Sequence, residues 1–87
     1  SKVFVSCNGI KDKAIATFSE EEGEVQRIAL NNANKKYLLA DHSKFNKFDF
    51  YTFYNISEID TIVSDSKLSQ ETFEELSKQT TILLSKP

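Results

Sequence analysis

Residues 37–44 read YLLADHSK, and this stretch decides the class of fold that the sequence predicts. Its first half is an uninterrupted apolar run, which is typical of a parallel strand covered on both faces. Its second half is polar and predicts a loop that begins where the strand ends. Ligands of open parallel sheets bind beside the carboxyl ends of the strands. The polar residues after this strand are therefore candidates for a binding site.

Strands and helices are also predicted before this stretch. Residues 2–6 read KVFVS, which is apolar and β-branched and predicts a strand that ends at a turn over Asn8-Gly9. Ser19 and Glu22 have the spacing of a helix capping box. Apolar residues then recur at helical intervals, so a helix of about three turns is predicted.

The rest of the sequence predicts two or three further strands and a second helix. The aromatic run 48–54 predicts a strand or extended segment, 56–59 one helical turn, and 61–64 a short strand. Ser69 is a second candidate N-cap, and 80–84 (TTILL) predicts a last strand. This order of elements predicts an α/β fold with a mainly parallel sheet and flanking helices.

Composition restricts the class of protein. The chain has 87 residues, 39% of them hydrophobic, which is enough for one small core. Its formal net charge of −2 argues against a nucleic-acid-binding domain, which usually carries a basic excess. The apolar runs are too short to span a membrane, and a single Cys fits a reducing compartment. We therefore expect a cytoplasmic protein with no membrane partner.

The candidate ligand-binding side chains follow the predicted strands. They are Asn8 and Gly9 after the first strand, Asp41, Ser43 and Lys44 after the second, and Asp65 after the third. A lysine supplies a charge for a phosphate group, while amide and carboxylate groups can bond sugar hydroxyls. The set favours a phosphorylated sugar, although strand-end loops are polar in most proteins.

Four blocks of the sequence resemble the sensor domain of DeoR-family transcriptional repressors. They are FVSCNGI (4–10), EEGEVQR (21–27), LLADHSKF (38–45) and IDTIVSD (59–65). The resemblance implies a fold like ribose-5-phosphate isomerase and the CoA transferases (NagB/RpiA/CoA transferase-like). It also implies that residues 1–87 are the C-terminal part of the effector-sensing domain, without the N-terminal helix-turn-helix domain and the first half of the sensor. The start at Ser1, directly before an apolar strand, is interpreted as a cut within a longer protein.

The same resemblance implies a function. The expected protein is a repressor of sugar catabolism, of a lactose or galactose phosphotransferase operon, whose inducer is a phosphorylated sugar such as tagatose 6-phosphate. Operator DNA would be bound through the absent N-terminal domain and not through this fragment. A homo-oligomer is expected, and no cofactor.

The resemblance also assigns roles to individual residues. Lys44 matches a lysine at the sugar-phosphate site of the isomerase, and Glu22 recurs in the family pattern. Asn8 and Gly9 fall where the isomerase has an Asp-Glu pair. An amide cannot act as a general acid or base, so the resemblance implies a sensor and not an enzyme. The alternative is a sugar-phosphate isomerase or deaminase of the same fold.

Several of these residues have a simpler structural interpretation. Asp41 and Ser43 could bind a sugar or could stabilise the turn that follows, and Asp65 could cap the segment before Ser69. Glu22 is better explained by the capping box.

Cys7 and His42 are not expected to carry chemistry. Cys7 is interpreted as a partly buried side chain and not a nucleophile, and His42 as exposed. With one His and one Cys, no metal site is expected. Lysines interleaved with aromatic residues over 44–54 could stack on single-stranded nucleic acid, but packing in a core or an interface is the better interpretation.

Overall fold

The computed structural model describes residues 1–85 and has two β-sheets with two α-helices. The larger sheet has the order β1-β4-β6-β7, and all of its pairs are parallel. Its strands are β1 (Lys2–Ser6), β4 (Lys35–Leu39), β6 (Thr61–Asp65) and β7 (Thr81–Ser85). The α-helices are α1 (Glu20–Asn31) and α2 (Gln70–Leu76), and no helix within residues 1–85 is long and apolar enough to cross a membrane. The prediction of an α/β fold with a mainly parallel sheet is confirmed.

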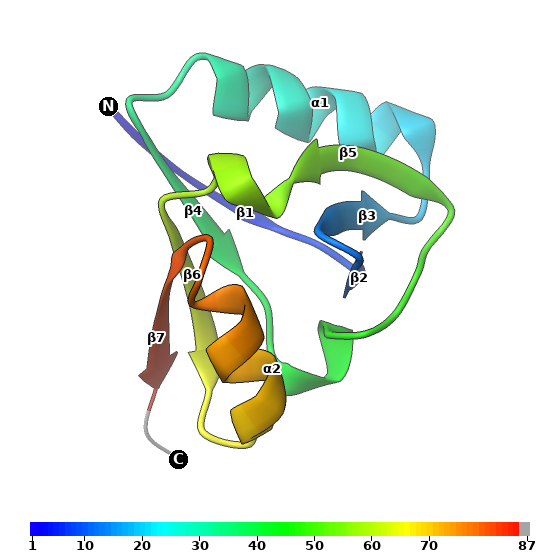
Figure 1. The fold of residues 1–87 in the computed structure, drawn as a ribbon. Coiled ribbons are helices and arrows are strands. Elements are labelled where there is room, and N and C mark those ends of the chain that lie inside the picture. The colour runs from blue at the N-terminus through cyan, green and yellow to red at the C-terminus, as the bar shows by residue number, and fades with distance from the viewer. Residues whose placement is uncertain (86–87) are drawn as a thin grey trace.

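One face of the parallel sheet forms the core. Val5, Leu38, Ile62 and Ile82 each point to this face from a different strand, and Leu38 and Ile62 have no exposed surface. Figure 1 shows α2 in front of β6 on this side of the sheet, and α1 beside β5. The helices and the second sheet therefore cover one and the same face.

A small antiparallel sheet was not anticipated from the sequence. It has the order β2-β3-β5 and consists of β2 (Gly9–Lys11), β3 (Ala14–Thr17) and β5 (Tyr51–Asn55). The aromatic run therefore gives a strand, as predicted, but that strand pairs with β3 and not with the parallel sheet. Gly9 begins β2, so the predicted turn at 8–9 is only a bend at Asn8.

The hairpin of β2 and β3 lacks the usual sequence signal for its turn. Asp12 and Lys13 occupy its two central positions with φ angles of 51° and 71°. Such turns normally contain Gly or Asn-Gly, because a side chain disfavours positive φ. The strands are also only three and four residues long. The sequence therefore carries little local signal for this hairpin.

Helix α1 begins where the capping pattern predicts. The Ser19 side chain is the N-cap and accepts a hydrogen bond from the Glu22 backbone at 3.2 Å. The buried residues of the helix are Gly23, Gln26 and Leu30. Val25 and Ile28, two of the apolar residues that recur at helical intervals, are 62% and 59% exposed. The helix was predicted correctly, but the side that packs on the core is a different one.

Gly23 determines which side of α1 packs against β5. A Cβ atom at this position would lie 2.4 Å from Cδ2 of the Tyr51 ring. The Tyr51 hydroxyl donates a hydrogen bond to Glu24, and Arg27 forms an ion pair with Glu24 at 2.7 Å. Arg27 Nε also donates to the backbone carbonyl of Phe53 at 3.0 Å. The absence of a side chain at Gly23 lets the Tyr51 ring approach the helix closely within this network.

Two 3₁₀ helices complete the fold. They are η1 (His42–Lys44), directly after β4, and η2 (Ile56–Glu58), directly after β5. The second is the helical turn predicted over 56–59. The first gives a short, regular shape to the polar loop that follows the central apolar run.

Replacing Gly23 with Ala should destabilise the protein although Ala is the better helix former. The gain in helix propensity is about 1 kcal/mol, whereas overpacking of this kind costs about 1–3 kcal/mol, so a net loss is expected. Urea denaturation measures the free energy of unfolding. In a Tyr51→Leu background the same change should cost less, and an equal cost in both backgrounds would show that the ring contact is not responsible.

Candidate functional site

The polar residues after β1, β4 and β6 come together at the carboxyl edge of the parallel sheet. Asp65, the last residue of β6, accepts a hydrogen bond from the His42 backbone at 2.8 Å. Its carboxylate also contacts Nδ1 of His42 at 3.1 Å. The loop after β4 is thus attached to the end of β6, as expected for neighbouring parallel strands.

Asp65 stabilises its own loop as well. Its Oδ1 atom accepts from the Lys67 backbone at 2.9 Å. The hydrogen bonds from the His42 backbone and ring lower the pKa of Asp65 below the ordinary value, with a smaller contribution from Lys67. The capping interpretation of Asp65 therefore describes its observed contacts, and the tie to His42 is an additional one that the sequence did not reveal.

Asp41 and Ser43 bond to each other. Asp41 is the N-cap of η1, and its Oδ1 atom accepts from the Ser43 backbone at 2.8 Å and from the Ser43 hydroxyl. These bonds lower the pKa of the Asp41 carboxyl. Both residues are exposed, so each side chain still faces solvent. In this structure they show the turn-stabilising role that the sequence left open.

Lys44 lies near the end of β1. The Lys44 and Asp41 charges both influence the Cys7 thiol, which follows β1 directly. Lys44 is partly buried, whereas the other residues of η1 are exposed. A lysine at a sheet edge can attract an anionic ligand, because its ammonium group supplies a positive charge.

Cys7 itself is inert. Its side chain is 5% exposed, and burial raises the pKa of the thiol to about 12. The backbone of Gly9 and the Lys44 charge oppose this shift only in part. A thiol that stays protonated is a poor nucleophile, which agrees with the interpretation from the sequence, although Cys7 is more fully buried than expected.

Asn8 and Gly9 have different surroundings. Asn8 is exposed and its backbone donates to Ala16 at 2.9 Å. Gly9 is buried, and a Cβ atom there would lie 2.5 Å from the Lys47 carbonyl oxygen. The space beside Gly9 is therefore occupied by the chain itself. Asn8 is the one of the pair whose side chain faces solvent.

Glu22 lies in the first turn of α1, is exposed, and has its backbone bonded to Ser19. No hydrogen bond or ion pair within residues 1–85 connects its side chain with the strand-edge residues. The structure therefore supports the capping interpretation and does not join Glu22 to the other candidates.

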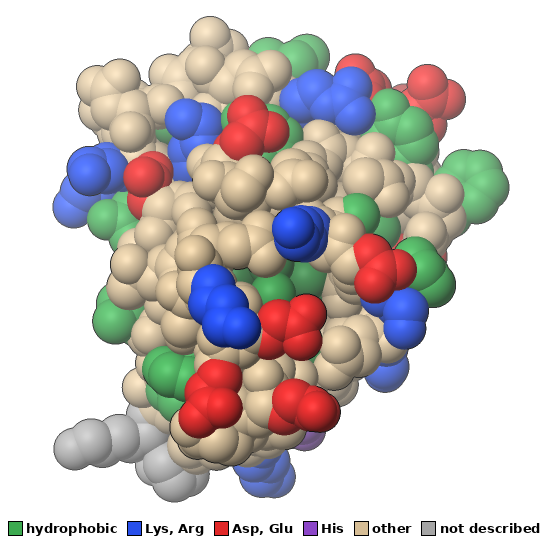
Figure 2. Space-filling view, viewed as in Figure 1, with side chains coloured by type: hydrophobic (Ala, Val, Ile, Leu, Met, Phe, Trp, Pro, Cys, Tyr) green, Lys and Arg blue, Asp and Glu red, His purple; other side chains and the backbone are tan. Residues whose placement is uncertain are grey.

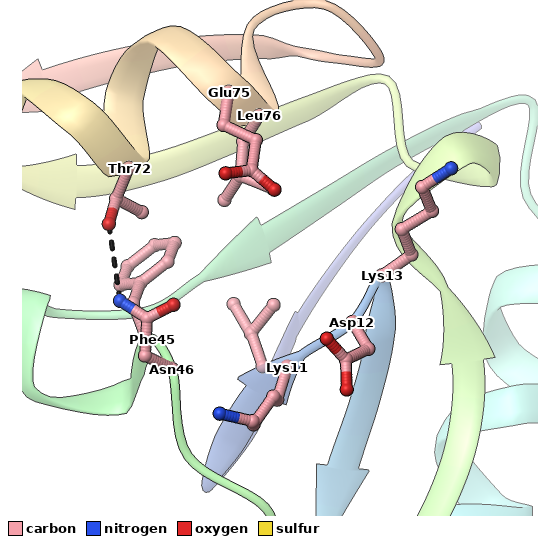
Figure 3. A pocket seen from close by; sticks show the side chains of 9 residues that line it. Lys11, Asp12, Lys13, Phe45, Asn46, Thr72, Glu75 and Leu76 are labelled. Atoms are coloured by element: carbon pink, nitrogen blue, oxygen red, sulfur yellow. Dashed lines mark hydrogen bonds between the residues drawn. The ribbon is translucent and has the colours of Figure 1, made fainter.

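A cavity of about 280 Å³ between the β2–β3 turn and α2 is lined by none of these candidate residues. It is lined by Ile10, Lys11, Asp12, Lys13, Phe45, Asn46, Thr72, Glu75 and Leu76. Figure 3 shows Asn46 and Thr72 joined by a hydrogen bond of 3.2 Å at one side of the cavity. Sequence reasoning missed this cavity, because it depends on the unrecognised hairpin.

A group of potential metal ligands occurs at the strand edge. One ligand atom each of Asp41, His42 and Asp65 can be chosen so that all lie within 4.8 Å of one another. The His42–Asp65 and Asp41–Ser43 hydrogen bonds already account for this compact arrangement. Structural zinc sites use four ligands, usually with Cys or several His, so these residues are a poor match to that donor set.

The surface gives little support to nucleic-acid binding. Figure 2 shows basic and acidic side chains interspersed over the visible face. Within the aromatic run, Phe45 and Phe53 are buried in the core, whereas Phe48 and Phe50 are 70% and 79% exposed. The packing interpretation holds for the first two of these residues. Of the exposed pair, Phe48 has the Lys11 ammonium group over its ring, 5.3 Å from the ring centroid.

The parallel sheet with polar residues at its carboxyl edge defines an α/β domain, and sensor domains of the DeoR C-terminal type have the ribose-5-phosphate isomerase-like fold. The model of the DeoR C-terminal sensor domain matches residues 1–66. The chain therefore belongs to the DeoR C-terminal sensor family, as the four sequence blocks predicted.

Similar proteins carry the name lactose phosphotransferase system repressor. The protein from Lactococcus lactis subsp. lactis is 47% identical over 83 residues, which is 95% of this chain and 32% of that protein. The one from Streptococcus mutans is 40% identical over 83 residues, 95% of this chain and 33% of its own length. A Staphylococcus epidermidis protein is 44% identical over 66 residues. The chain spans about a third of the length of the first two relatives.

The buried Cys7 should resist alkylation in the folded protein. At pH 9 a thiol with a pKa near 12 is almost fully protonated, so its reaction with iodoacetamide should have roughly a hundredth or less of the denatured rate. Because the folded-state pKa is raised, stability should fall as the pH rises above the ordinary thiol pKa towards 12. A Glu71→Cys variant supplies an exposed thiol as control, and equal rates at both cysteines would contradict the prediction.

Replacing Asp65 with Asn should loosen the loop after β4. One amide oxygen cannot accept all the bonds of the carboxylate, so backbone exchange at His42 and Lys67 should become several-fold faster in hydrogen-exchange measurements. Asp60→Asn is a matched control, since Asp60 accepts from the Lys36 backbone at 2.8 Å and should affect that amide instead.

The effect of Asp65→Asn should depend on pH. The lowered pKa of Asp65 means that its contribution is present above the ordinary Asp pKa and is lost as the pH falls through the lowered value. The difference between the parent protein and the variant should therefore disappear in strong acid. A difference that persisted there would show that the carboxylate charge is not involved.

Proposed function

We propose that this chain is the effector-sensing part of a transcriptional repressor of sugar catabolism. The proposal rests on membership of the sensor family and on the names of the relatives, which are repressors of the lactose phosphotransferase system. In the full-length protein, operator DNA would be bound by a part outside these 87 residues. A cytoplasmic location and assembly into a homo-oligomer belong to the same proposal.

The proposed effector is a phosphorylated sugar, with tagatose 6-phosphate as the specific expectation. The observation that carries this proposal is the position of Lys44, a partly buried cation beside the end of β1 in a loop that Asp65 holds in place. Such a cation can neutralise a phosphate group. The Asn8 amide and the exposed Asp41 and Ser43 side chains would bond sugar hydroxyls.

Binding would act on transcription by shifting a conformational equilibrium. A ligand shifts such an equilibrium only if it binds one state more tightly than the other. The loop 41–44 is suited to this task, because its contacts reach two neighbouring strands. A phosphate on Lys44 would change the charge balance around Asp41 and His42, and with it the contacts of this loop with Asp65.

An enzyme of the same fold is the second candidate, and the local chemistry does not favour it. Asn8 presents an amide and Gly9 no side chain, so neither can transfer protons. The nearby thiol of Cys7 is buried and protonated. Purified full-length protein should therefore not turn over ribose 5-phosphate or an amino-sugar phosphate, and measurable turnover would overrule the sensor proposal in favour of the enzyme.

Replacing Lys44 with Ala in the full-length protein should weaken effector binding. A hydrogen bond to a charged group contributes about 1.5–3 kcal/mol, which corresponds to roughly a 10- to 100-fold rise in Kd. Calorimetry with a panel of sugar phosphates, including tagatose 6-phosphate, measures this change. Lys78→Ala, an exposed lysine just after α2, is the control and should leave Kd unchanged.

Two calorimetric results would count against the proposal. If the folded parent protein bound none of the sugar phosphates, the proposal that the effector is a phosphorylated sugar would be rejected. If the parent and the Lys44→Ala variant bound a sugar phosphate with equal affinity, the proposed class of effector would be retained. The proposal that Lys44 contacts the effector would be rejected.

A further inference from the structure

The cavity between the β2–β3 turn and α2 has sides of opposite net charge and an apolar floor (Figure 3). Its volume of about 280 Å³ is at the small end for ligand pockets. It has room for about nine groups of the size of a water molecule. None of the residues proposed to bind a sugar phosphate lines it. A ligand of this cavity would therefore be a second ligand of the domain.

The floor of the cavity is buried and held in place by the chain itself. Its apolar lining residues are Ile10, Phe45 and Leu76, and at most 9% of each is exposed. Ile10 and Phe45 form a parallel bridge, and the Asn46 backbone donates to the Ile10 carbonyl at 2.7 Å. An apolar group placed on this floor would be removed from water, which favours binding.

Asn46 joins the two sides of the cavity. Its side-chain amide donates to Thr72 of α2 at 3.2 Å, while its backbone bonds to β2. No hydrogen bond within the described part of the chain reaches the Asn46 side-chain oxygen. In Figure 3 this oxygen and the Glu75 carboxylate both lie on the cavity side of their residues. Together they offer acceptors to a ligand that carries an ammonium group.

The two sides differ in charge. Residues 11–13 of the turn contain two lysines and one aspartate, a formal charge of +1. Helix α2 (Gln70–Leu76) contains three glutamates and no basic residue, a formal charge of −3. No ion pair within residues 1–85 joins Glu75 to Lys11 or Lys13. A ligand can complement both sides only if it too carries both signs of charge.

We propose that this cavity binds a free α-amino acid with an apolar side chain. The ligand carboxylate would pair with Lys11 and Lys13, and its ammonium group with Glu75 and the Asn46 oxygen. Its side chain would cover the apolar floor. Asp12 lies between the two lysines in the turn, so the net attraction for a carboxylate needs both lysines. A sugar phosphate has no cation to meet Glu75, and a simple amine would leave the lysines unpaired.

Calorimetry with the full-length protein tests this proposal, with L-leucine, L-valine and L-methionine as probes. Two analogues of leucine each lack one charge, since isoamylamine has no carboxylate and isocaproate has no ammonium group. Loss of one charged contact should weaken binding about 10-fold or more relative to leucine. If the folded protein bound none of the three amino acids, the proposal would be overturned. An analogue that bound as tightly as leucine would also overturn it.

A substitution on α2 tests the position of the ligand. Glu75→Gln removes the charge that faces the ligand ammonium group and should raise the Kd for leucine about 10-fold or more. Glu71→Gln is the matched control, because Glu71 is an exposed glutamate of the same helix that does not line the cavity. It should leave Kd unchanged. Equal values of Kd for the two variants would reject the cavity as the site.

Methyl NMR of the parent full-length protein gives a readout without a substitution. Saturating unlabelled leucine should shift the methyl signal of Ile10, since this residue forms part of the floor. The signal of Ile28, which is exposed on α1, should stay unchanged. A shift at Ile28 without one at Ile10 would place the amino acid elsewhere and overturn the proposal.

Discussion

The path of the chain after β4 is the constraint on which the rest of the structure depends. After the central strand the chain crosses β2, where Asn46 donates to the Ile10 carbonyl at 2.7 Å and the Phe45 side chain enters the core at 6% exposure. The crossing is so close that only Gly9 fits beside the Lys47 carbonyl. Because the crossing fixes the loop at its far end and Asp65 fixes it at the near end, the segment 41–44 is held between two strands.

The same kind of backbone contact organises the other side of the core. Gly23 brings α1 against the ring of Tyr51, and Arg27 bonds to the backbone of β5. On its other side, β5 pairs with β3 of the β2–β3 hairpin. Strand β3 in turn pairs with β2, which contains Ile10. Both glycines of the protein thus stand where a side chain would clash, Gly9 against the Lys47 backbone and Gly23 against the Tyr51 ring.

The carboxyl edge of the parallel sheet and its outer face differ in chemical character, the first being polar and the second apolar. At its carboxyl edge, Lys44 is the partly buried residue of an otherwise exposed polar loop, and the proposed effector site is built on this lysine. On its outer face, apolar side chains occupy three successive strands without cover among the described residues.

The sequence by itself determined the parallel strands, both helix starts and the polar residues at the strand ends, because periodicity and capping are local properties. It did not reveal the hairpin, since Asp12 and Lys13 adopt positive φ without a glycine. It did not predict which side of α1 is buried or why residue 9 must be a glycine, since each depends on a contact with a residue more than 25 positions away. The contacts between His42 and Asp65 and the exposure of Phe4, Leu39 and Leu83 on the second face of the parallel sheet were likewise decided only by tertiary structure. Contacts between distant segments leave no periodic signal in a single sequence, and only the folded chain brings their partners together.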